Sequence, residues 1–442
     1  MGATEQRERI LAATAELVAK RGYHATTVEL IVKRAGLARN TFYEHFANRE
    51  ECLLACLDET ALRAGERIAA AVHAEGEWPH QVRAALVACL DYLAVEPARV
   101  RTFLVESTSA GPAATQRYDD ALERLARALR SGRTLAPSGA RLPDVLEDSL
   151  VGALVWMVHP RFLRGEVSEI PGLLPRMVRF TLAPYIGAER AAEYAGVEAP
   201  AGEDVDSVAA DPGAPPDEEP AAVGALEDPV TLRPLPAGRH GMSPELVARD
   251  QRKRILAAMV RCVGERGYEK TSIAQVIALA SVSRQTYYQH FVDKEDCFAA
   301  AYDAAVARIE AHVEAAVASA RDWPELVAGA IRALLDFLAA HPDMARLCFT
   351  DTAAVGDAFA ARRDRDNRRW LEQLAAGRNH HAGARDPGDG IEEALLAGLA
   401  TLITRRIRAG EIEQLRDLSA ELIELALTPF LGPERAHSAA LA

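Results

Sequence analysis

Two seven-residue segments of the chain carry side chains of the kind that bind nucleic acids. They are RNTFYEH at 39–45 and RQTYYQH at 284–290. Arginine can form two parallel hydrogen bonds with guanine, and asparagine or glutamine can do the same with adenine. Threonine and tyrosine hydroxyls commonly bind phosphate oxygens. The side chains predicted to face outward are Arg39, Asn40, Thr41, Tyr43 and His45 in the first segment, and Arg284, Gln285, Thr286 and Tyr288 in the second.

Two helices before residue 39 are expected to hold the first segment in place. Apolar residues recur at helical spacing over 10–18, and Gly22 follows as a C-terminal cap. Thr26 or Thr27 can cap a second helix, and Gly36 marks its end. A short helix, a tight turn and a third helix with a polar outer face are typical of a DNA-reading helix-turn-helix.

The third helix is predicted over 39–46, with Phe42 and Phe46 turned into the core. Asn48 and Glu51 form a capping pair that predicts the start of a fourth helix. The corresponding signals in the second segment are Gly267, Thr271 or Ser272, Tyr287, Phe291, and the pair Asp293 and Asp296.

The two segments belong to one long internal repeat. At an offset of 245 residues, 21 of the 54 positions in 7–60 are identical to their partners without a gap. The same offset aligns Trp78 with Trp323, and 182–191 with 427–436. A match that extends through both halves of the chain predicts that a whole unit was duplicated.

The net charge of −13 argues at first against nucleic acid, because phosphate binding depends on Lys and Arg. However, eleven acidic residues and no Lys or Arg lie within 191–231, whereas 1–50 hold eight Lys and Arg against six acids, and 247–296 nine against six. The candidate DNA-binding segments are thus mildly basic. The stretch 192–243 has no helical or strand period and is predicted to be a disordered acidic linker.

The string G-Y-x-x-T-[TS], followed after about twelve residues by R-x-T-[FY]-Y-x-H-F, resembles the N-terminal domain of the TetR family of bacterial regulators. The resemblance covers about 50 residues of each copy. It implies an all-α protomer with an N-terminal DNA-binding domain, a C-terminal ligand-binding and dimerising domain, and regulation by a small molecule. It also implies that Thr27 and Ser272 stand at a phosphate-facing helix start, that Tyr43, His45, Tyr288 and His290 lie near phosphates, and that Arg49 and Lys294 make the next phosphate contact.

The two copies depart from the family pattern at different positions. Family members often have Ser before the recognition helix, which Ser283 matches and Ala38 does not. The turn glycine is present as Gly36 in the first copy, whereas Ser281 replaces it in the second. Losing a Ser at an N-cap costs about 1 kcal/mol. We therefore expect a weakened helix rather than the loss of the motif.

The remainder of each copy reads as amphipathic helices interrupted by prolines. Aromatic residues in these halves could line a ligand pocket, but we expect most of them to belong to an ordinary core. The pocket candidates are Trp78, Tyr92, Phe103 and Trp156 in the first copy, and Trp323, Phe337, Phe349 and Trp370 in the second. The last two helices of each copy, where the resemblance places dimerisation, are predicted at 144–164 and 170–187, and at 390–410 and 412–431.

Other kinds of chemistry are poorly supported. No nucleophile–base pair, phosphate loop or metal-ligand spacing indicates an enzyme, and we expect no catalytic residue, cofactor or metal. We interpret Cys52 and Cys297 as structural thiols rather than redox sensors, and His380 and His381 as exposed residues rather than metal ligands. No window is apolar enough to span a membrane, and the polar start lacks a secretory signal. The protein is therefore predicted to be cytoplasmic and associated with the nucleoid.

The sequence predicts an all-α protein of two tandem TetR-like units. The predicted domains are a helix-turn-helix at 1–50, a helical regulatory and dimerisation domain at 51–191, the linker at 192–243, a second helix-turn-helix at 244–295 and a second regulatory domain at 296–436. The predicted function is a transcriptional regulator, a repressor relieved by an unidentified small-molecule effector. One chain would read both half-sites of a double-stranded DNA operator as an intramolecular pseudo-dimer, with a homodimer of tandem chains as the alternative assembly. The alternative function is a ligand-responsive scaffold or sensor in which one or both helix-turn-helix units no longer bind DNA.

Overall fold

The computed structural model describes residues 2–108, 110–136, 142–196, 243–350, 357–380 and 390–442. Every regular element within these ranges is a helix, and none is a strand, which confirms the all-α prediction. The chain divides into two compact units, each described by itself. Unit 1 comprises Met1–Ala199, Arg365–Arg405 and Glu421–Ala442, and unit 2 comprises Pro200–Asp364 and Arg406–Ala420.

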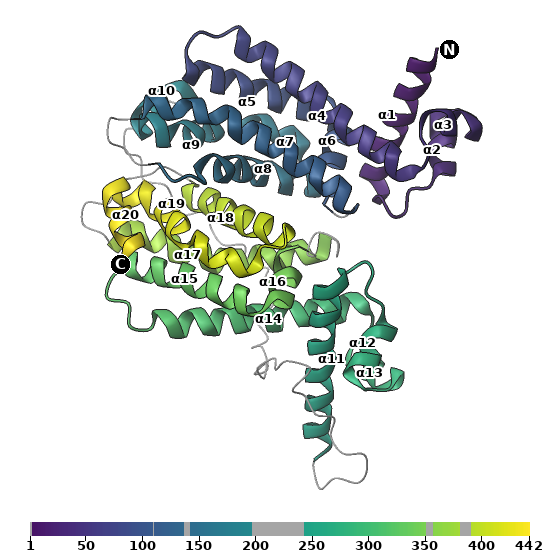
Figure 1. Ribbon diagram of the computed structural model, residues 1–442, viewed down its shortest axis with the longest axis vertical. Coiled ribbons are helices and arrows are strands. Elements are labelled where there is room, and N and C mark those ends of the chain that lie inside the picture. Colours follow the sequence, from purple (N-terminus) through teal and green to yellow (C-terminus); the bar gives the residue numbers. More distant parts are fainter. Residues whose placement is uncertain (1, 109, 137–141, 197–242, 351–356, 381–389) are drawn as a thin grey trace. The chain divides into compact units, whose positions relative to one another are not determined.

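The first copy contains a three-helix head and a helical body (Figure 1). The first head consists of α1 (Ala3–Arg21), α2 (Val28–Ala35) and α3 (Arg39–His45). Its body consists of α4 (Arg49–His73), α5 (Trp78–Val95), α6 (Pro97–Arg101), the π-helix η1 (Thr102–Glu106), α7 (Pro112–Leu129), the 3-10 helix η2 (Arg130–Leu135), α8 (Leu146–Arg164), the 3-10 helix η3 (Val167–Leu173), α9 (Leu174–Ile186) and α10 (Ala188–Ala195).

The second copy repeats these elements. The second head consists of α11 (Pro244–Arg266), α12 (Ile273–Ala280) and α13 (Arg284–His290). Its body consists of α14 (Lys294–Val317), α15 (Trp323–Ala340), α16 (Pro342–Phe349), α17 (Asp357–His380), α18 (Ile391–Arg408), η5 (Ile412–Leu418), α19 (Ser419–Leu431) and α20 (Pro433–Leu441). At the offset of 245 residues, α2 and α12, α3 and α13, and α9 and α19 begin and end at equivalent residues. The predicted tandem duplication is confirmed.

The ends of both copies differ from the prediction. The helix expected over 170–187 begins as the 3-10 segment η3, and α9 starts only at Leu174, with Pro175 in its first turn. A proline lacks the backbone N–H that the interior of an α-helix requires, but it is tolerated in a first turn. The equivalent range 412–431 is likewise divided into η5 and α19.

A further short helix follows the predicted last helix of each copy. In the first copy, α10 continues to Ala195, inside the range predicted as linker, because Ala191 and Ala195 are buried and Gly196 ends the helix in a left-handed conformation. In the second copy, α20 extends beyond the predicted end at residue 436.

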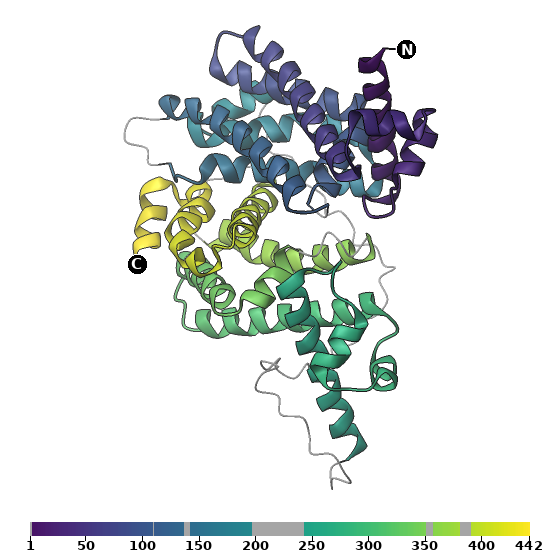
Figure 2. The same ribbon diagram turned by 45° about the vertical axis from the view of Figure 1, so that its right-hand side comes forward.

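Unit 1 brings α8 of the first copy against α18 of the second. The two helices lie next to each other in both views (Figures 1 and 2). Arg405 on α18 pairs with Asp148 on α8 at 2.5 Å, and Arg176 on α9 pairs with Glu393 on α18.

Across the described residues, no helix is both long and apolar enough to cross a membrane.

Candidate nucleic-acid interface

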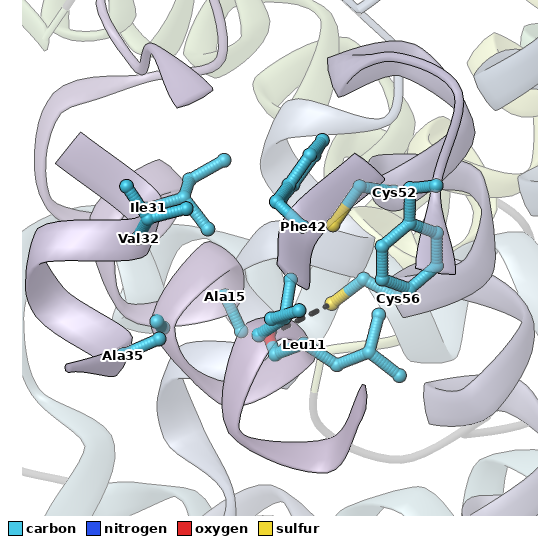
Figure 3. Close-up of a cluster of buried hydrophobic side chains, with 11 residues drawn as sticks. Leu11, Ala15, Ile31, Val32, Ala35, Phe42, Cys52 and Cys56 are labelled. Atoms are coloured by element: carbon cyan, nitrogen blue, oxygen red, sulfur yellow. Dashed lines mark hydrogen bonds between the residues drawn. The ribbon is translucent and has the colours of Figure 1, made fainter. Parts of the chain in front are cut away.

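The core of the first head fixes the orientation of α3. Phe42 is fully buried and Phe46 is nearly so, among residues that include Leu11, Ile31 and Cys52 (Figure 3). Because Phe42 faces inward, the rest of α3 turns toward solvent. Arg39 and Asn40 are exposed, Tyr43 keeps 46% of its surface exposed, and Thr41 is half-buried.

The second head presents its polar residues in the same way. Tyr287 is fully buried and Phe291 nearly so. Arg284 and Gln285 are exposed, and Thr286 is half-buried. Tyr288 is 46% exposed, as Tyr43 is in the first head. Both heads therefore display an arginine, an amide, a threonine and a tyrosine, as the sequence predicted.

An arginine and a tyrosine lie together on each recognition helix. The Arg39 guanidinium is 5.7 Å from the centre of the Tyr43 ring, and its Nη2 donates to the Tyr43 hydroxyl at 3.4 Å. The Arg284 guanidinium is also 5.7 Å from the Tyr288 ring. Each tyrosine ring makes a T-shaped contact with the buried aromatic residue before it, and each tyrosine remains 46% exposed.

Side-chain caps fix the start of the helix that precedes each turn. The prediction allowed Thr26 or Thr27, and the structure selects Thr27, whose Oγ1 accepts from Leu30 N at 3.3 Å. In the second head the cap is Ser272, which forms a reciprocal capping box with Gln275. Thr27 and Ser272 are exposed, and their helix N-termini offer backbone N–H groups of the kind that bind phosphate.

The two turns differ as the sequence indicated. Gly36 ends α2 in the left-handed region, at φ 63°, where glycine is unstrained. Ser281 adopts the same conformation at φ 52°, which costs a side-chain-bearing residue about 1–2 kcal/mol. Ala38 provides no side-chain cap for α3, whereas Ser283 Oγ accepts from Thr286 N at 3.0 Å.

A pair of equivalent arginines, which was not among the predicted site residues, stabilises both turns. Arg9 Nη2 donates to the carbonyl of Ala35 at 2.5 Å, and Arg254 Nη1 donates to Ala280 O at 2.8 Å. A cation at the carbonyl end of a helix is favourable because the last carbonyls carry partial negative charge. The available signal was the repeat itself, which keeps an arginine at both positions just before an apolar run.

The next pair of cations points inward rather than to solvent. Arg49 Nη1 donates to the carbonyls of Tyr23, His24 and Thr26, and its guanidinium lies 4.2 Å from the Tyr23 ring. In the second head, Lys294 Nζ donates to Tyr268 O at 3.1 Å and lies 4.0 Å from that ring. These contacts tie α4 and α14 to the loop before the helix-turn-helix. A phosphate contact by Arg49 or Lys294 would have to be made in addition to them.

His45, which was predicted to face outward, and its equivalent His290 are both half-buried at the ends of the recognition helices. His45 Nε2 is buried without a hydrogen-bond partner. Burial, together with the nearby Arg252, lowers the pKa of His290 below its ordinary value. Either histidine contributes less exposed surface than the arginine and tyrosine of the same helix.

The cysteines of the heads are poor candidates for redox chemistry. Burial raises the pKa of Cys52 to about 12, that of Cys56 to about 11 and that of Cys297 to about 12. These thiols are therefore protonated at neutral pH, and the thiolate is the reactive form. His381 and the side chain of His380 lie outside the described residues.

The aromatic residues proposed for a ligand pocket do not form one cluster. Trp78 and Tyr92 both lie on α5, fourteen residues apart, which corresponds to about 21 Å along a helix. Trp78 packs its edge on Tyr185, whereas Phe103 packs on Tyr118. The equivalent Trp323 and Phe337 are separated in the same way on α15, and Trp156, Phe349 and Trp370 are half-buried.

Comparison with known proteins identifies the heads. Residues 10–56 and 255–301 match the family described as bacterial regulatory proteins, tetR family. The HTH-type transcriptional activator FasR of Mycolicibacterium smegmatis is 30% identical over 89 residues, which are 20% of this chain and 41% of that protein. A fatty acid metabolism regulator protein of Bacillus subtilis is 39% identical over 51 residues, 12% of this chain and 26% of that protein. The matches thus span less than half of each relative.

Solved structures with lower sequence identity are also similar. The fatty acid degradation regulator FadR from Bacillus halodurans is 19% identical with a TM-score of 0.37, over 40% of this chain and 94% of that one. The transcriptional regulator FadR from Bacillus subtilis, in complex with stearoyl-CoA, is 20% identical with a TM-score of 0.34, over 39% of this chain and 97% of that one.

Proposed function

Because each head of this chain belongs to the tetR family of bacterial regulatory proteins, we propose that the chain is a sequence-specific DNA-binding transcriptional regulator whose two heads read the two half-sites of one operator. The observation that carries this proposal is the equal display of arginine, amide, threonine and tyrosine on α3 and α13. Since Arg39-Asn40 and Arg284-Gln285 differ only conservatively, the two half-sites are related but not identical.

The proposed assembly is an intramolecular pseudo-dimer. A helix-turn-helix dimer reads half-sites that are about 34–36 Å apart. The ion pairs of Asp148 with Arg405 and of Arg176 with Glu393 join residues of the two copies within unit 1, which supports pairing of the copies in one chain. Light scattering should give the mass of one chain, whereas twice that mass would favour a dimer of tandem chains.

The direct test of DNA reading is the double variant R39A/R284A in an electrophoretic retardation assay with genomic fragments. It should abolish specific retardation, because both bidentate base contacts are removed. The control R127A/R321A removes the same two charges from side chains that are 63% and 87% exposed on α7 and just before α15. Specific binding retained by R39A/R284A would rule out these helices as the readers.

Regulation is proposed to be repression that is relieved by a small effector bound in the bodies. The effector must bind the DNA-free and DNA-bound states with different affinities, because equal affinity shifts nothing. Fatty-acid metabolites are the first compounds to screen, since one relative is named a fatty acid metabolism regulator protein. If no compound in a broad screen changed DNA affinity, a constitutive DNA binder would be the better description.

A second candidate function is a sensor in which only one head binds DNA. One observation favours it: α2 ends with Lys33 and Arg34, whereas the equivalent positions of α12 are Ala278 and Leu279, and Leu279 is 41% exposed. The first helix of this motif crosses the DNA backbone, where cations add affinity. The single variants distinguish the two functions. If R284A leaves affinity unchanged and R39A abolishes it, the second head does not bind DNA.

A further inference from the structure

We propose that the α8 face of the first copy and the α18 face of the second copy are specific for each other, and that neither face fits a second copy of itself. The proposal rests on the proposed function, because it concerns the pairing that would form the pseudo-dimer. Its evidence is a pair of glycines and a pair of arginines, each of which is present in only one of the two copies.

The first glycine is Gly152 on α8, which faces Thr401 on α18. A Cβ atom at Gly152 would lie 2.5 Å from Thr401 Oγ1 and 2.6 Å from Thr401 Cβ, closer than real Cβ contacts come. At the offset of 245 residues, the equivalent of Gly152 is Ala397. If two α18 faces met in this geometry, the methyl group of Ala397 would overlap with Thr401 of the other chain.

The second glycine is Gly398 on α18, and it makes the opposite restriction. A Cβ atom there would overlap with Ser149 Oγ on α8 and lie 3.1 Å from the Ser149 carbonyl oxygen. The equivalent of Gly398 in the first copy is Ala153. Two α8 faces in the same geometry would therefore force the Ala153 methyl group against Ser149. Each copy therefore has a glycine opposite a side chain of the other copy: Gly152 faces Thr401, and Gly398 faces Ser149.

The charges across this contact are also distributed unequally. Asp148 and Glu393 are equivalent positions, and each pairs with an arginine of the other copy. Arg405 binds Asp148, and Arg176 binds Glu393 while also donating to Gly390 O at 3.0 Å.

The two arginines themselves have no counterparts. The equivalent of Arg176 is Glu421, so two α18 faces would bring Glu421 to the position beside Glu393 that Arg176 occupies. The two carboxylates, Glu421 and Glu393, would then repel each other because they carry like charges. The equivalent of Arg405 is Pro160, so two α8 faces would lack the Arg405 contact to Asp148. The sizes of the side chains at these positions and the charges of the two arginines thus favour pairing of the α8 face with the α18 face, called the mixed pair. In a symmetric pair of two identical faces, each overlap would occur twice.

The decisive experiment cuts the connection between the two copies after the full chain has folded. A protease site is inserted within 197–242, the full chain is folded and cleaved, and the products are analysed by native mass spectrometry. The expected result is a complex of one N-terminal and one C-terminal half. Homodimers of either half at equilibrium would overturn the proposal.

A size exchange tests the glycine contact itself. G152A should raise the dissociation constant of the cleaved halves roughly tenfold, because overpacking a tight contact weakens binding by at least about that factor. G152A/T401G restores the space and should recover association relative to G152A. The control is G172A, because nothing lies within 4 Å of a Cβ at Gly172, and it should associate like the unchanged chain.

Either of two outcomes would contradict the glycine contact. One is a G152A complex as tight as the unchanged one, and the other is an exchange variant no tighter than G152A. DNA retardation is measured separately with the uncleaved chain. Mixed pairing without DNA binding would refute the proposed function and leave this pairing intact.

Discussion

The two copies hold their heads against their bodies in different ways. In the first copy, Glu8 on α1 binds Arg99 on α6 at 2.5 Å and Arg63 on α4 at 2.8 Å. The Arg99 side chain is only 4% exposed, whereas Glu8 is 40% exposed, so only the arginine of this ion pair is buried. In the second copy the equivalents of Glu8 and Arg99 are Lys253 and Met344, and that ion pair cannot form.

Close packing takes the place of the ion pair in the second copy. Gly264 on α11 lies so near α16 that a Cβ there would be 2.6 Å from the Cα of Asp343. The first copy has Ala19 at the equivalent position. Packing of this kind depends on shape, whereas an ion pair depends on the charges and solvent around it.

One contact is common to both copies. Arg101 Nε donates to Ala19 O at 2.8 Å, and Arg346 Nη1 donates to Gly264 O at 3.0 Å. Each head is therefore joined to its body by the same arginine contact and by a second contact, which is an ion pair in the first copy and close packing in the second. A change in the body would reach both heads through this arginine contact, and in addition through an ion pair in the first copy and through close packing in the second.

The largest expected effect comes from E8Q, which leaves the buried Arg99 without its principal carboxylate. Removing one partner of a fully buried pair costs about 3–5 kcal/mol, and because Glu8 is 40% exposed we expect roughly 2 kcal/mol. Hydrogen exchange of α1 amides measures this as a lower local opening free energy. The double variant E8K/R99M copies the second copy and should be less destabilised than E8Q; equal destabilisation would contradict the ion-pair explanation.

The second prediction is that G264A destabilises the second head. Replacing glycine by alanine within a helix normally stabilises it by about 1 kcal/mol, but here the added methyl meets backbone, and overpacking costs about 1–3 kcal/mol. We therefore expect a net loss of about 1 kcal/mol in the α11 opening free energy by hydrogen exchange. The matched change A19G in the first head should lower the opening free energy of α1 only by the difference in helix propensity between alanine and glycine. A stabilised G264A variant would show that α11 and α16 can separate without penalty.

The turns provide the third test, with opposite signs in the two copies. S281G should stabilise the second head by about 1 kcal/mol, since it removes the left-handed strain of a residue with a side chain. G36S should destabilise the first head, because it introduces that strain and places a Cβ 2.9 Å from Arg9 Nη2. Thermal denaturation followed by calorimetry checks both, and the same sign of change for both variants would refute this account.

The smallest effect concerns the pH dependence of the second head's stability. The pKa of His290 is lowered mainly by burial. The folded head therefore binds a proton less readily than the unfolded chain, in which a histidine has a pKa of about 6.5. Stability is therefore full above that value and falls as the pH drops from it toward the lower folded pKa. Opening free energies measured between about pH 5 and 8 should show this loss, and H290Q should flatten it. An unchanged slope in H290Q would assign the dependence to another group.

Much of the fold and of the candidate site was determined by the sequence alone. The 245-residue offset gave the duplication, and the helical periods with Gly22, Gly36 and Gly267 gave the helices of both heads. The inward Phe42 and Tyr287 and the outward arginines and tyrosines followed from the same period. These features depend on neighbours within about one helical turn, so the local pattern is sufficient to predict them.

The tertiary structure decided the contacts between distant residues. It turned Arg49 and Lys294 onto loop carbonyls, assigned Arg9 and Arg254 to the ends of α2 and α12, and separated Trp78 from Tyr92 along α5. It also brought Gly152 against Thr401, residues that are far apart in the chain. Such contacts depend on how helices cross and pack, and no short-range pattern records that geometry.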